Sequence, residues 1–241
     1  MKLDILVLAA HPDDAELGCG GTIAAHVNQG KKVGIIDFTR GELGSRGTPE
    51  IRDQEAKAAS QILGLAVREN LEFEDGFLVN NREHQLKLIE IIRRFRPEIV
   101  LASAVRDRHI DHGRAALIAQ EACFLSGLVK IMTYNEQGEA EEPWRPKALY
   151  HYIQDYYIQP DLVVDVTPYW STKMDAVTAY SSQFYSTQRE QKGRQTPIST
   201  LEFIHFLEGR AREMGRSIGV EFGEGFTKAT PIGVRDLLTL F

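Results

Sequence analysis

The chain is poor in cysteine and in long apolar runs. Cys19 and Cys123 are its two cysteines among 241 residues. This is too few for a disulfide framework, so we expect a reducing, cytoplasmic location. The apolar stretch at residues 3–10 is too short for a signal peptide and no cationic segment leads into it. No stretch approaches the roughly 20 apolar residues of a membrane-spanning helix, so we expect no membrane insertion.

Basic residues are also fewer than acidic residues. The formal net charge is −6, and lysine and arginine form no long run. We therefore expect no general affinity for nucleic acid or anionic membranes. Apolar residues make up 43% and charged residues 26% of the chain, as in ordinary globular proteins with a sizeable core. Since neither an internal repeat nor a low-complexity linker divides it, we predict one domain over residues 1–241.

Short apolar runs alternate with amphipathic segments along the chain. This alternation predicts an α/β fold, Rossmann-like, with a mostly parallel sheet and helices on both faces. The expected strands are residues 3–10, 32–38, 98–102, 148–153 and 162–166, with short strand material in 67–79. The expected helices are residues 21–29, 50–63 and 83–96, followed by a more helical C-terminal third.

Potentially reactive side chains follow two of the predicted strands. His11-Pro12-Asp13-Asp14 comes directly after the first, and residues 106–112, which read RDRHIDH, come after the fourth. In open α/β sheets, ligands bind at the carboxyl ends of the strands, and in the common strand order the first and fourth strands are neighbours. We therefore expect the two clusters to face each other at that edge.

Histidine nitrogen and carboxylate oxygen are the donors that Zn²⁺ prefers, and a catalytic zinc takes three protein ligands and a water. Two histidines and one aspartate from the two clusters meet that count, which leaves others for acid–base and orienting roles. Either cluster alone is more typical of hydrogen-bonded surface groups, but the pair together favours a metal site. The other histidines, which have no such partners nearby in sequence, are interpreted as structural: His26, His84, His151 and His205.

A dinucleotide site is the main alternative. Glycines at 18, 20 and 21 follow the first strand, and Asp37 ends the second, where a ribose-binding acid would lie. However, Gly18 comes late after the strand, and Ile23 occupies the third position of G-x-G-x-x-G. We therefore interpret the glycines as sites of close packing and tight helix entry, and Asp37 as structural. A serine hydrolase is less favoured because no G-x-S-x-G motif occurs, and a non-catalytic binding protein stays open.

Two motifs resemble those of a known family. HPDDAELGCGGT at 11–22 and DRHIDHGRAA at 107–116 resemble the LmbE-like, or PIG-L, zinc-dependent N-acetylglucosamine deacetylases. The segments at 39–56, 182–185, 210–212 and 219–226 resemble the bacillithiol biosynthesis branch. That branch removes acetate from N-acetylglucosaminyl malate, a substrate that resemblance alone suggests. The alternative is another N-acetylglucosamine substrate, free or oligomeric, and the family also suggests a homo-oligomer such as a hexamer.

The resemblance implies roles for the residues of both clusters. By it, His11, Asp14 and His112 hold one zinc ion per chain, and Asp13 is the general base. It further implies that a protonated His109 stabilises the oxyanion, with Asp111 as its orienting partner.

Substrate contacts are expected from two arginines. By resemblance, Arg52 contacts the substrate, and we expect it to bind the malate carboxylates; the alternative is a surface arginine paired with Glu55 or Asp53. Arg108, close to the second motif, is expected to assist with substrate anions. The loops at 39–49, 134–146 and 186–197 are long enough to cover a site.

Overall fold

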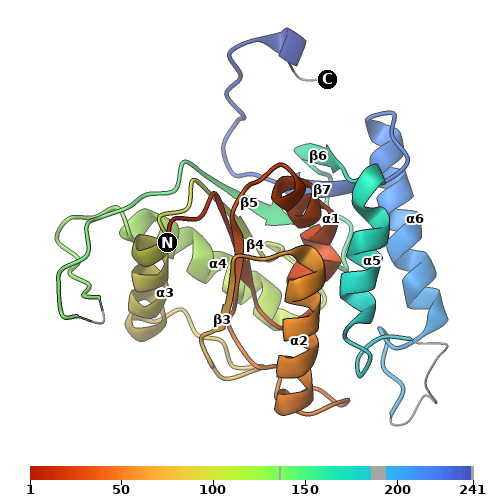
Figure 1. The fold of residues 1–241 in the computed structure, drawn as a ribbon, viewed down its shortest axis with the longest axis horizontal. Coiled ribbons are helices and arrows are strands. Elements are labelled where there is room, and N and C mark those ends of the chain that lie inside the picture. The colour runs from red at the N-terminus through yellow and green to blue at the C-terminus, as the bar shows by residue number, and fades with distance from the viewer. Residues whose placement is uncertain (136, 186–193, 240–241) are drawn as a thin grey trace.

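A seven-stranded sheet lies at the centre of the computed structural model, which describes residues 1–135, 137–185 and 194–239 (Figure 1). The strand order is β3-β2-β1-β4-β5-β7-β6, and β7 alone runs against its neighbours. The mostly parallel α/β sheet is thus confirmed. The strands are β1 Ile5–Ala9, β2 Val33–Asp37, β3 Val67–Asn70, β4 Ile99–Ala102, β5 Ala148–Tyr152, β6 Leu162–Asp165 and β7 Gly223–Thr227.

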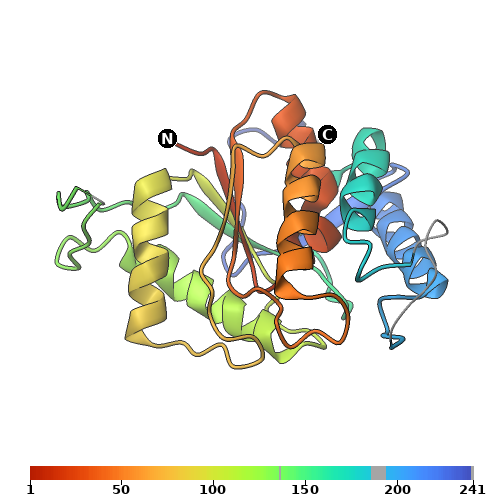
Figure 2. The same ribbon diagram turned by 60° about the horizontal axis from the view of Figure 1, so that its bottom comes forward.

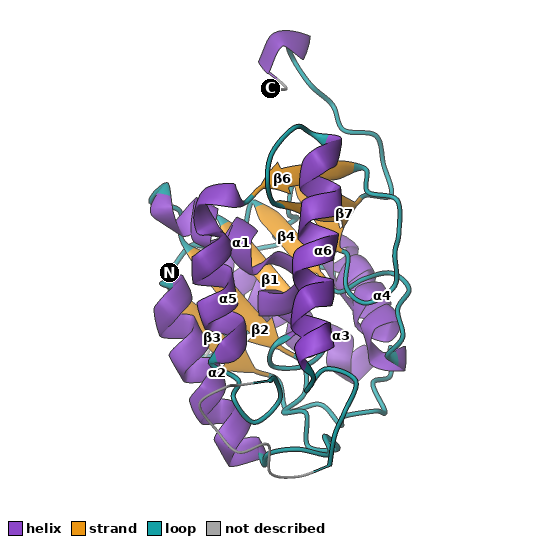
Figure 3. Cartoon of the chain, turned by 90° about the vertical axis from the view of Figure 1, so that its right-hand side faces the viewer, coloured by secondary structure: helices purple, strands orange, loops and turns teal. Residues whose placement is uncertain are grey.

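Helices cover both faces of the sheet (Figures 1 and 2). Helices α3 and α4 lie on one face, and α1, α2, α5 and α6 lie on the other, which Figure 3 shows in front of the strands. The helices are α1 Asp14–Asn28, α2 Pro49–Leu63, α3 Arg82–Phe95, α4 Ile110–Leu125, α5 Trp170–Thr178 and α6 Leu201–Ser217, with short 3-10 turns η1 Thr167–Tyr169 and η2 Leu237–Thr239. No helix in the described ranges is long and apolar enough to cross a membrane.

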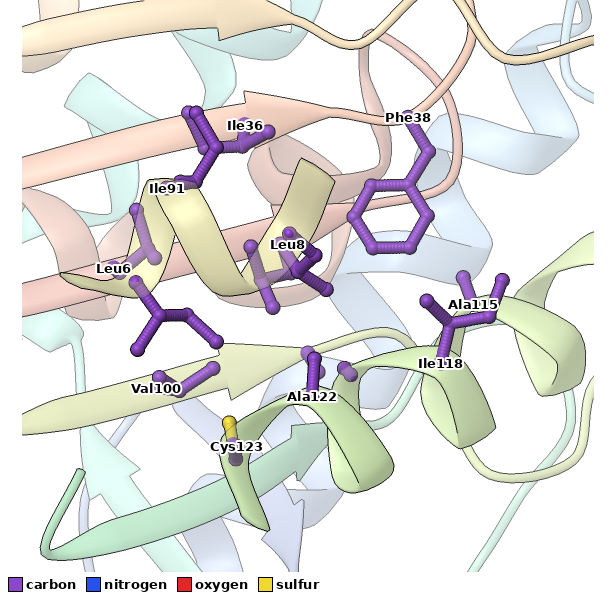
Figure 4. Packing of buried hydrophobic residues seen from close by; sticks show 14 of the residues in the cluster. Leu6, Leu8, Ile36, Phe38, Ile91, Val100, Ala115, Ile118, Ala122 and Cys123 are labelled. Carbon is purple, nitrogen blue, oxygen red and sulfur yellow. The ribbon is translucent and has the colours of Figure 1, made fainter. Parts of the chain in front are cut away.

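Alternate residues of each central strand point to opposite faces. In β1, Leu6 and Leu8 pack toward α3 and α4, whereas Ile5 and Val7 pack toward α1 and its neighbours. Figure 4 shows the first of these clusters, where Leu8 lies among side chains of β2, β4 and α4. Fully burying each such side chain contributes roughly 1.5–3 kcal/mol, so this core fixes the register of the strands that lead into the reactive clusters.

Strand β1 pairs in parallel with β4, with Leu8 opposite Ala102. The segments that follow these strands therefore leave the sheet at the same edge, as predicted. The predicted loop at 134–146 does not end at this edge of the sheet. Nε1 of Trp144 donates to the carbonyl oxygen of Pro97, which precedes the start of β4. The prediction that this loop covers the site was wrong, because its end is held at the opposite edge.

Strand β7 was not predicted. It contains Gly223 and Gly225, and glycine is unfavourable in strands. A Cβ at Gly223 would lie 2.6 Å from Cγ1 of Val163, and one at Gly225 would lie 2.8 Å from Sδ of Met214. The glycines therefore allow β7 to pack closely against β6 and α6. The sequence pattern alone does not show these contacts, because they join residues that are far apart in the chain.

Candidate active site

The site begins at the turn between β1 and α1. Asp13 has φ 105° and ψ −24°, in the left-handed region, and Asp14 starts the helix. A non-glycine residue in that region costs on the order of 1–3 kcal/mol and is typical of functional sites. The turn gives the two adjacent carboxylates different partners: Asp14 contacts His11 and His112, and Asp13 contacts Arg52.

Asp14 lies between the two histidines. Its Oδ2 is 3.2 Å from Nδ1 of His11, and its Oδ1 is 3.2 Å from Nε2 of His112. Ligand atoms that surround a tetrahedral zinc at about 2.0–2.2 Å are roughly 3.3–3.6 Å from one another. All three side chains are buried. The donor types therefore fit a zinc ion, and Asp14 faces the two rings with different oxygens of its carboxylate.

Further donors adjoin these three. Ring nitrogens of His11, His109 and His112 lie within 4.8 Å of one another, and so do ligand atoms of His11, Asp75 and Asp111. The described residues thus include a His/Asp cluster suited to a metal ion, with His11 in both groups. The assignment of His11, Asp14 and His112 as the ligands stays a prediction.

The second nitrogen of each expected histidine ligand contacts another carboxylate. Nε2 of His11 is 3.0 Å from Oδ1 of Asp75, and Nδ1 of His112 is 2.5 Å from Oδ2 of Asp107. Metal-binding histidines almost always donate their other N–H to such a partner, which fixes the tautomer and ring orientation. The sequence interpretation missed Asp75, although its place just after β3, at the same edge of the sheet, was the available signal.

The carboxylates stabilise positive charge at both rings. Burial alone would lower the pKa of His11, but hydrogen bonds to Asp111, Asp14 and Asp75 outweigh it and raise that pKa well above its usual value. Burial likewise opposes the rise for His112, but the charge of Asp14 and the bond to Asp107 raise its pKa to about 9. The carboxylates of Asp14, Asp75, Asp107 and Asp111 therefore make the surroundings of both rings electronegative.

Arg52 binds the carboxylate of Asp13. Its Nη2 donates to Oδ2 of Asp13 at 2.9 Å and to the carbonyl oxygen of Pro12 at 2.5 Å, and its Nη1 donates to the carbonyl oxygen of Gly41 at 3.3 Å. The side chain borders the cavity but is 6% exposed, so the alternative of a surface arginine was wrong. A Cβ at Gly41 would lie 1.9 Å from Nη1, which explains the glycine there. Burial, opposed by the charge of Arg52, raises the pKa of Asp13 to about 7.

His109 precedes α4 and caps it. The backbone N–H of Asp111 donates to Nδ1 of His109 at 3.3 Å, so the ring proton lies on Nε2. Burial and the charges of His11 and His112 lower the pKa of His109. The protonated His109 that the family resemblance implies stays a prediction.

The carboxylate of Asp111 has other partners than the His109 ring. Its Oδ2 accepts from the backbone N–H of Gly76 at 2.6 Å, and its Oδ1 accepts from Arg114 at 3.1 Å. Oδ2 is also 3.6 Å from Nε2 of His11. The direct contact with His109 that the structure shows is made by the backbone of Asp111.

A cavity of about 240 Å³ opens over these groups. Its lining includes Phe203, Phe206 and Arg210 of α6, and Arg108 from the loop before α4. Arg108 is largely exposed and pairs with Asp155 at 3.2 Å. Leu43 and Gly44 line the cavity, as expected of the loop at 39–49. Of the predicted loop at 186–197, residues 186–193 lie outside the described residues.

The dinucleotide alternative fails at Asp37. Both carboxylate oxygens accept from Arg68, at 2.7 and 2.9 Å, and the pair is buried. A ribose therefore finds no free acceptor there. A Cβ at Gly18 would lie 2.2 Å from the ring of Tyr152, and one at Gly21 would lie 2.7 Å from Val166. The glycines serve close packing, as predicted.

Comparison with known proteins agrees with this geometry. The family model "PIG-L: GlcNAc-PI de-N-acetylase" matches residues 6–123. Diacetylchitobiose deacetylase of Thermococcus kodakarensis is 30% identical over 75% of this chain and 70% of its own length. The chain belongs to the PIG-L family. It is a deacetylase of the N-acetylglucosamine type, and thus an amide hydrolase.

Two other proteins cover most of the chain. The structure of the conserved protein TT1542 from Thermus thermophilus has a TM-score of 0.84 and 37% identity over 98% of both chains. The 4-oxalmesaconate hydratase of Pseudomonas putida is 26% identical over 85% of this chain and 86% of its own length. These matches support the family, and the resemblance to the bacillithiol branch in particular finds no added support in them.

Proposed function

We propose that this PIG-L protein removes the acetyl group from the nitrogen of a free or oligomeric N-acetylglucosamine substrate, such as diacetylchitobiose, with one bound zinc ion. The observation that carries the proposal is the arrangement of Asp14 between His11 and His112, with a carboxylate on the far nitrogen of each ring. The substrate class is supported by the similarity to a diacetylchitobiose deacetylase.

His11, Asp14 and His112 would hold the zinc ion. When bound, zinc acts as a Lewis acid that polarises a carbonyl and lowers the pKa of water. Asp75 and Asp107 hold the two rings in the orientation that presents Nδ1 of His11 and Nε2 of His112 to Asp14.

Asp13 moves the proton. Arg52 binds its Oδ2 and leaves Oδ1 without a protein hydrogen bond in the described part of the chain. This oxygen accepts a proton from the water that attacks the acetyl carbonyl carbon. With a pKa of about 7, Asp13 can both accept a proton and return it, as general acid–base catalysis requires. When the C–N bond breaks, the proton passes to the departing amine, which yields acetate and the free amino sugar.

His109 stabilises the developing charge. With Nδ1 occupied by the N–H of Asp111, its Nε2–H is the donor available for the oxyanion. One well-placed donor of this kind contributes about 2.7–4 kcal/mol to catalysis in acyl transfer. A neutral histidine is sufficient for this role.

The malate conjugate is a second candidate substrate. Arg108 and Arg210 both line the cavity, and arginine pairs well with carboxylates. Arg52 is a weaker candidate for that contact, because its two terminal nitrogens already donate to Asp13 and to backbone carbonyls.

Acetate release from a panel of substrates tests the proposal. The panel contains diacetylchitobiose, N-acetylglucosamine and N-acetylglucosaminyl malate, each with zinc-loaded and chelator-treated enzyme. We expect zinc-dependent acetate release, fastest from diacetylchitobiose. Preference for the malate conjugate would favour the second candidate. Absence of acetate release, with hydration of 4-oxalmesaconate, would replace the proposed function by that of the hydratase relative.

A further inference from the structure

Gln154 lies just after β5, at the edge of the sheet where the two reactive clusters meet. Strand β5 pairs in parallel with β4, so the segment after β5 leaves the sheet at the same edge as the segments after β1 and β4. The side chain of Gln154 is 5% exposed and lines the active-site cavity. A buried amide needs hydrogen-bond partners for both its oxygen and its nitrogen, and these partners indicate what Gln154 does.

The backbone sets the direction of the Gln154 amide. Oε1 of Gln154 accepts from the backbone N–H of Ala104 at 3.1 Å. Because a backbone N–H can only donate, the amide oxygen, and not the nitrogen, faces Ala104. The NH2 group therefore points the other way, where Nε2 lies 2.8 Å from Oδ1 of Asp14 and 3.5 Å from Nε2 of His112. The amide donor thus lies beside two of the three expected zinc ligands.

We propose that Gln154 is a positioning residue for Asp14, whose carboxylate it holds in the orientation that binds the metal ion. The inference rests on the proposed function, in which Asp14 is a zinc ligand. The backbone N–H of His11 donates to Oδ2 of Asp14 at 2.9 Å, and Gln154 donates to Oδ1. The carboxylate is therefore held at both oxygens. These two bonds use about half of its roughly four lone-pair sites, so Asp14 can be held and still face the two histidine rings.

A neutral amide suits a metal ligand because it adds no charge. Asp13, the preceding residue, is held instead by the cationic guanidinium of Arg52. A positive charge beside a carboxylate stabilises its ionised form, but it would also repel a divalent cation bound there. Gln154 orients Asp14 and leaves the whole negative charge of the carboxylate available to the metal. The two adjacent carboxylates thus receive donors of different charge, which matches the proposed roles of Asp13 as base and Asp14 as ligand.

Zinc affinity tests the role of Gln154. Gln154→Met keeps the length and approximate volume of the side chain but removes the N–H donor. Loss of a partner that orients a metal ligand typically costs roughly 10- to 100-fold in metal affinity, so we expect zinc to bind at least about 10-fold more weakly. Chelator competition measures the affinity, and circular dichroism of the metal-free protein confirms that the variant folds. Gln154→Leu, which also lacks the donor, is a second variant in which the same loss is expected.

Gln85→Met is the matched control. Gln85 of α3 is also 5% exposed, and its Nε2 donates to Oδ1 of Asn80 at 2.6 Å and to the carbonyl oxygen of Ile118 at 3.3 Å. Its replacement removes a buried amide far from the expected ligands, so zinc affinity should stay at the wild-type value. Wild-type zinc affinity in both Gln154 variants, or equal losses in Gln154→Met and Gln85→Met, would overturn the inference and leave the proposed function standing. A wild-type chain that binds no zinc would overturn both.

Discussion

The guanidinium of Arg52 lies 2.9 Å from the carboxylate of Asp13 and donates to it. Arg52 comes from α2 and Asp13 from the strained turn before α1, so two elements together fix the orientation of the proposed base. This contact occupies Nη2 of Arg52, the residue that the sequence predicted to bind substrate carboxylates. Arg52 is therefore better described as a positioning residue for Asp13.

Arg52→Ala tests this role. Loss of a charge-assisted hydrogen bond costs about 1.5–3 kcal/mol, so we expect kcat to fall roughly 10- to 150-fold with little change in KM. The loss should be equal on diacetylchitobiose and on the malate conjugate, while zinc content stays unchanged. Arg108→Ala, at the exposed mouth, is the control and should keep its kcat. A loss confined to the malate conjugate would return Arg52 to substrate recognition.

Asp75→Asn should weaken zinc binding. The substitution removes the charge that orients His11 through Nε2, and loss of such a partner typically costs 10- to 100-fold in metal affinity, by the order of magnitude known for other metal sites. Chelator competition measures the affinity. Asp53→Asn, an exposed carboxylate paired with Arg40, should leave it unaltered. Unchanged affinity in Asp75→Asn would show that Asp75 has no part in holding the metal.

Asp37→Ala should destabilise the protein without any effect on nucleotide binding. Removing one partner of a buried ion pair costs about 3–5 kcal/mol, and we expect the lower end of this range because Arg68 keeps its second partner, Glu16. Urea unfolding measures the free energy of unfolding, and fluorescence titration tests NADH. We expect no saturable NADH binding to the wild-type chain. Micromolar binding that Asp37→Ala abolishes would restore the dinucleotide interpretation.

Gly18→Ala should also destabilise the fold. Its Cβ would lie 2.2 Å from the ring of Tyr152, whose hydroxyl is held by Leu8 and Ser103, and overpacking of this kind costs about 1–3 kcal/mol or more. Gly209→Ala in α6 is the matched control, because its Cβ would meet nothing within 4 Å. Alanine should stabilise that helix by about 0.5–1 kcal/mol. Similar effects of both substitutions would contradict the packing role of Gly18.

Patterns local in sequence were enough to predict the parallel core. The apolar runs of β1 and β4 predicted two neighbouring buried strands. Because these strands pair in the sheet, His11 and His112 lie close to each other. Features that depend on distant contacts could not be predicted in this way. In β7, Gly223 leaves room for Val163 of β6 and Gly225 leaves room for Met214 of α6, and these contacts join residues that are far apart in sequence. Likewise, Asp75 becomes a partner of His11 only after β3 has taken its place in the sheet.

The start of α1 is a second feature that the sequence pattern did not predict correctly. The glycines at 18–21 suggested that the helix begins at Gly21, but it begins at Asp14 and has a non-helical residue at Cys19. Glu224 of β7 accepts from the backbone N–H groups of Gly21 and Thr22, just after this break. A helix with an interior break is stabilised here by a residue about 200 positions away, which local propensity cannot reveal.

Zinc content in two neighbouring aspartate variants tests the central claim most directly. Elemental analysis of Asp13→Ala and Asp14→Ala, purified without chelator, is combined with acetate release from diacetylchitobiose. We predict that Asp13→Ala retains one zinc ion per chain and loses activity, whereas Asp14→Ala loses both. If Asp13→Ala lost the metal while Asp14→Ala kept it, or if both variants released acetate at the wild-type rate, the proposed site and mechanism would be contradicted.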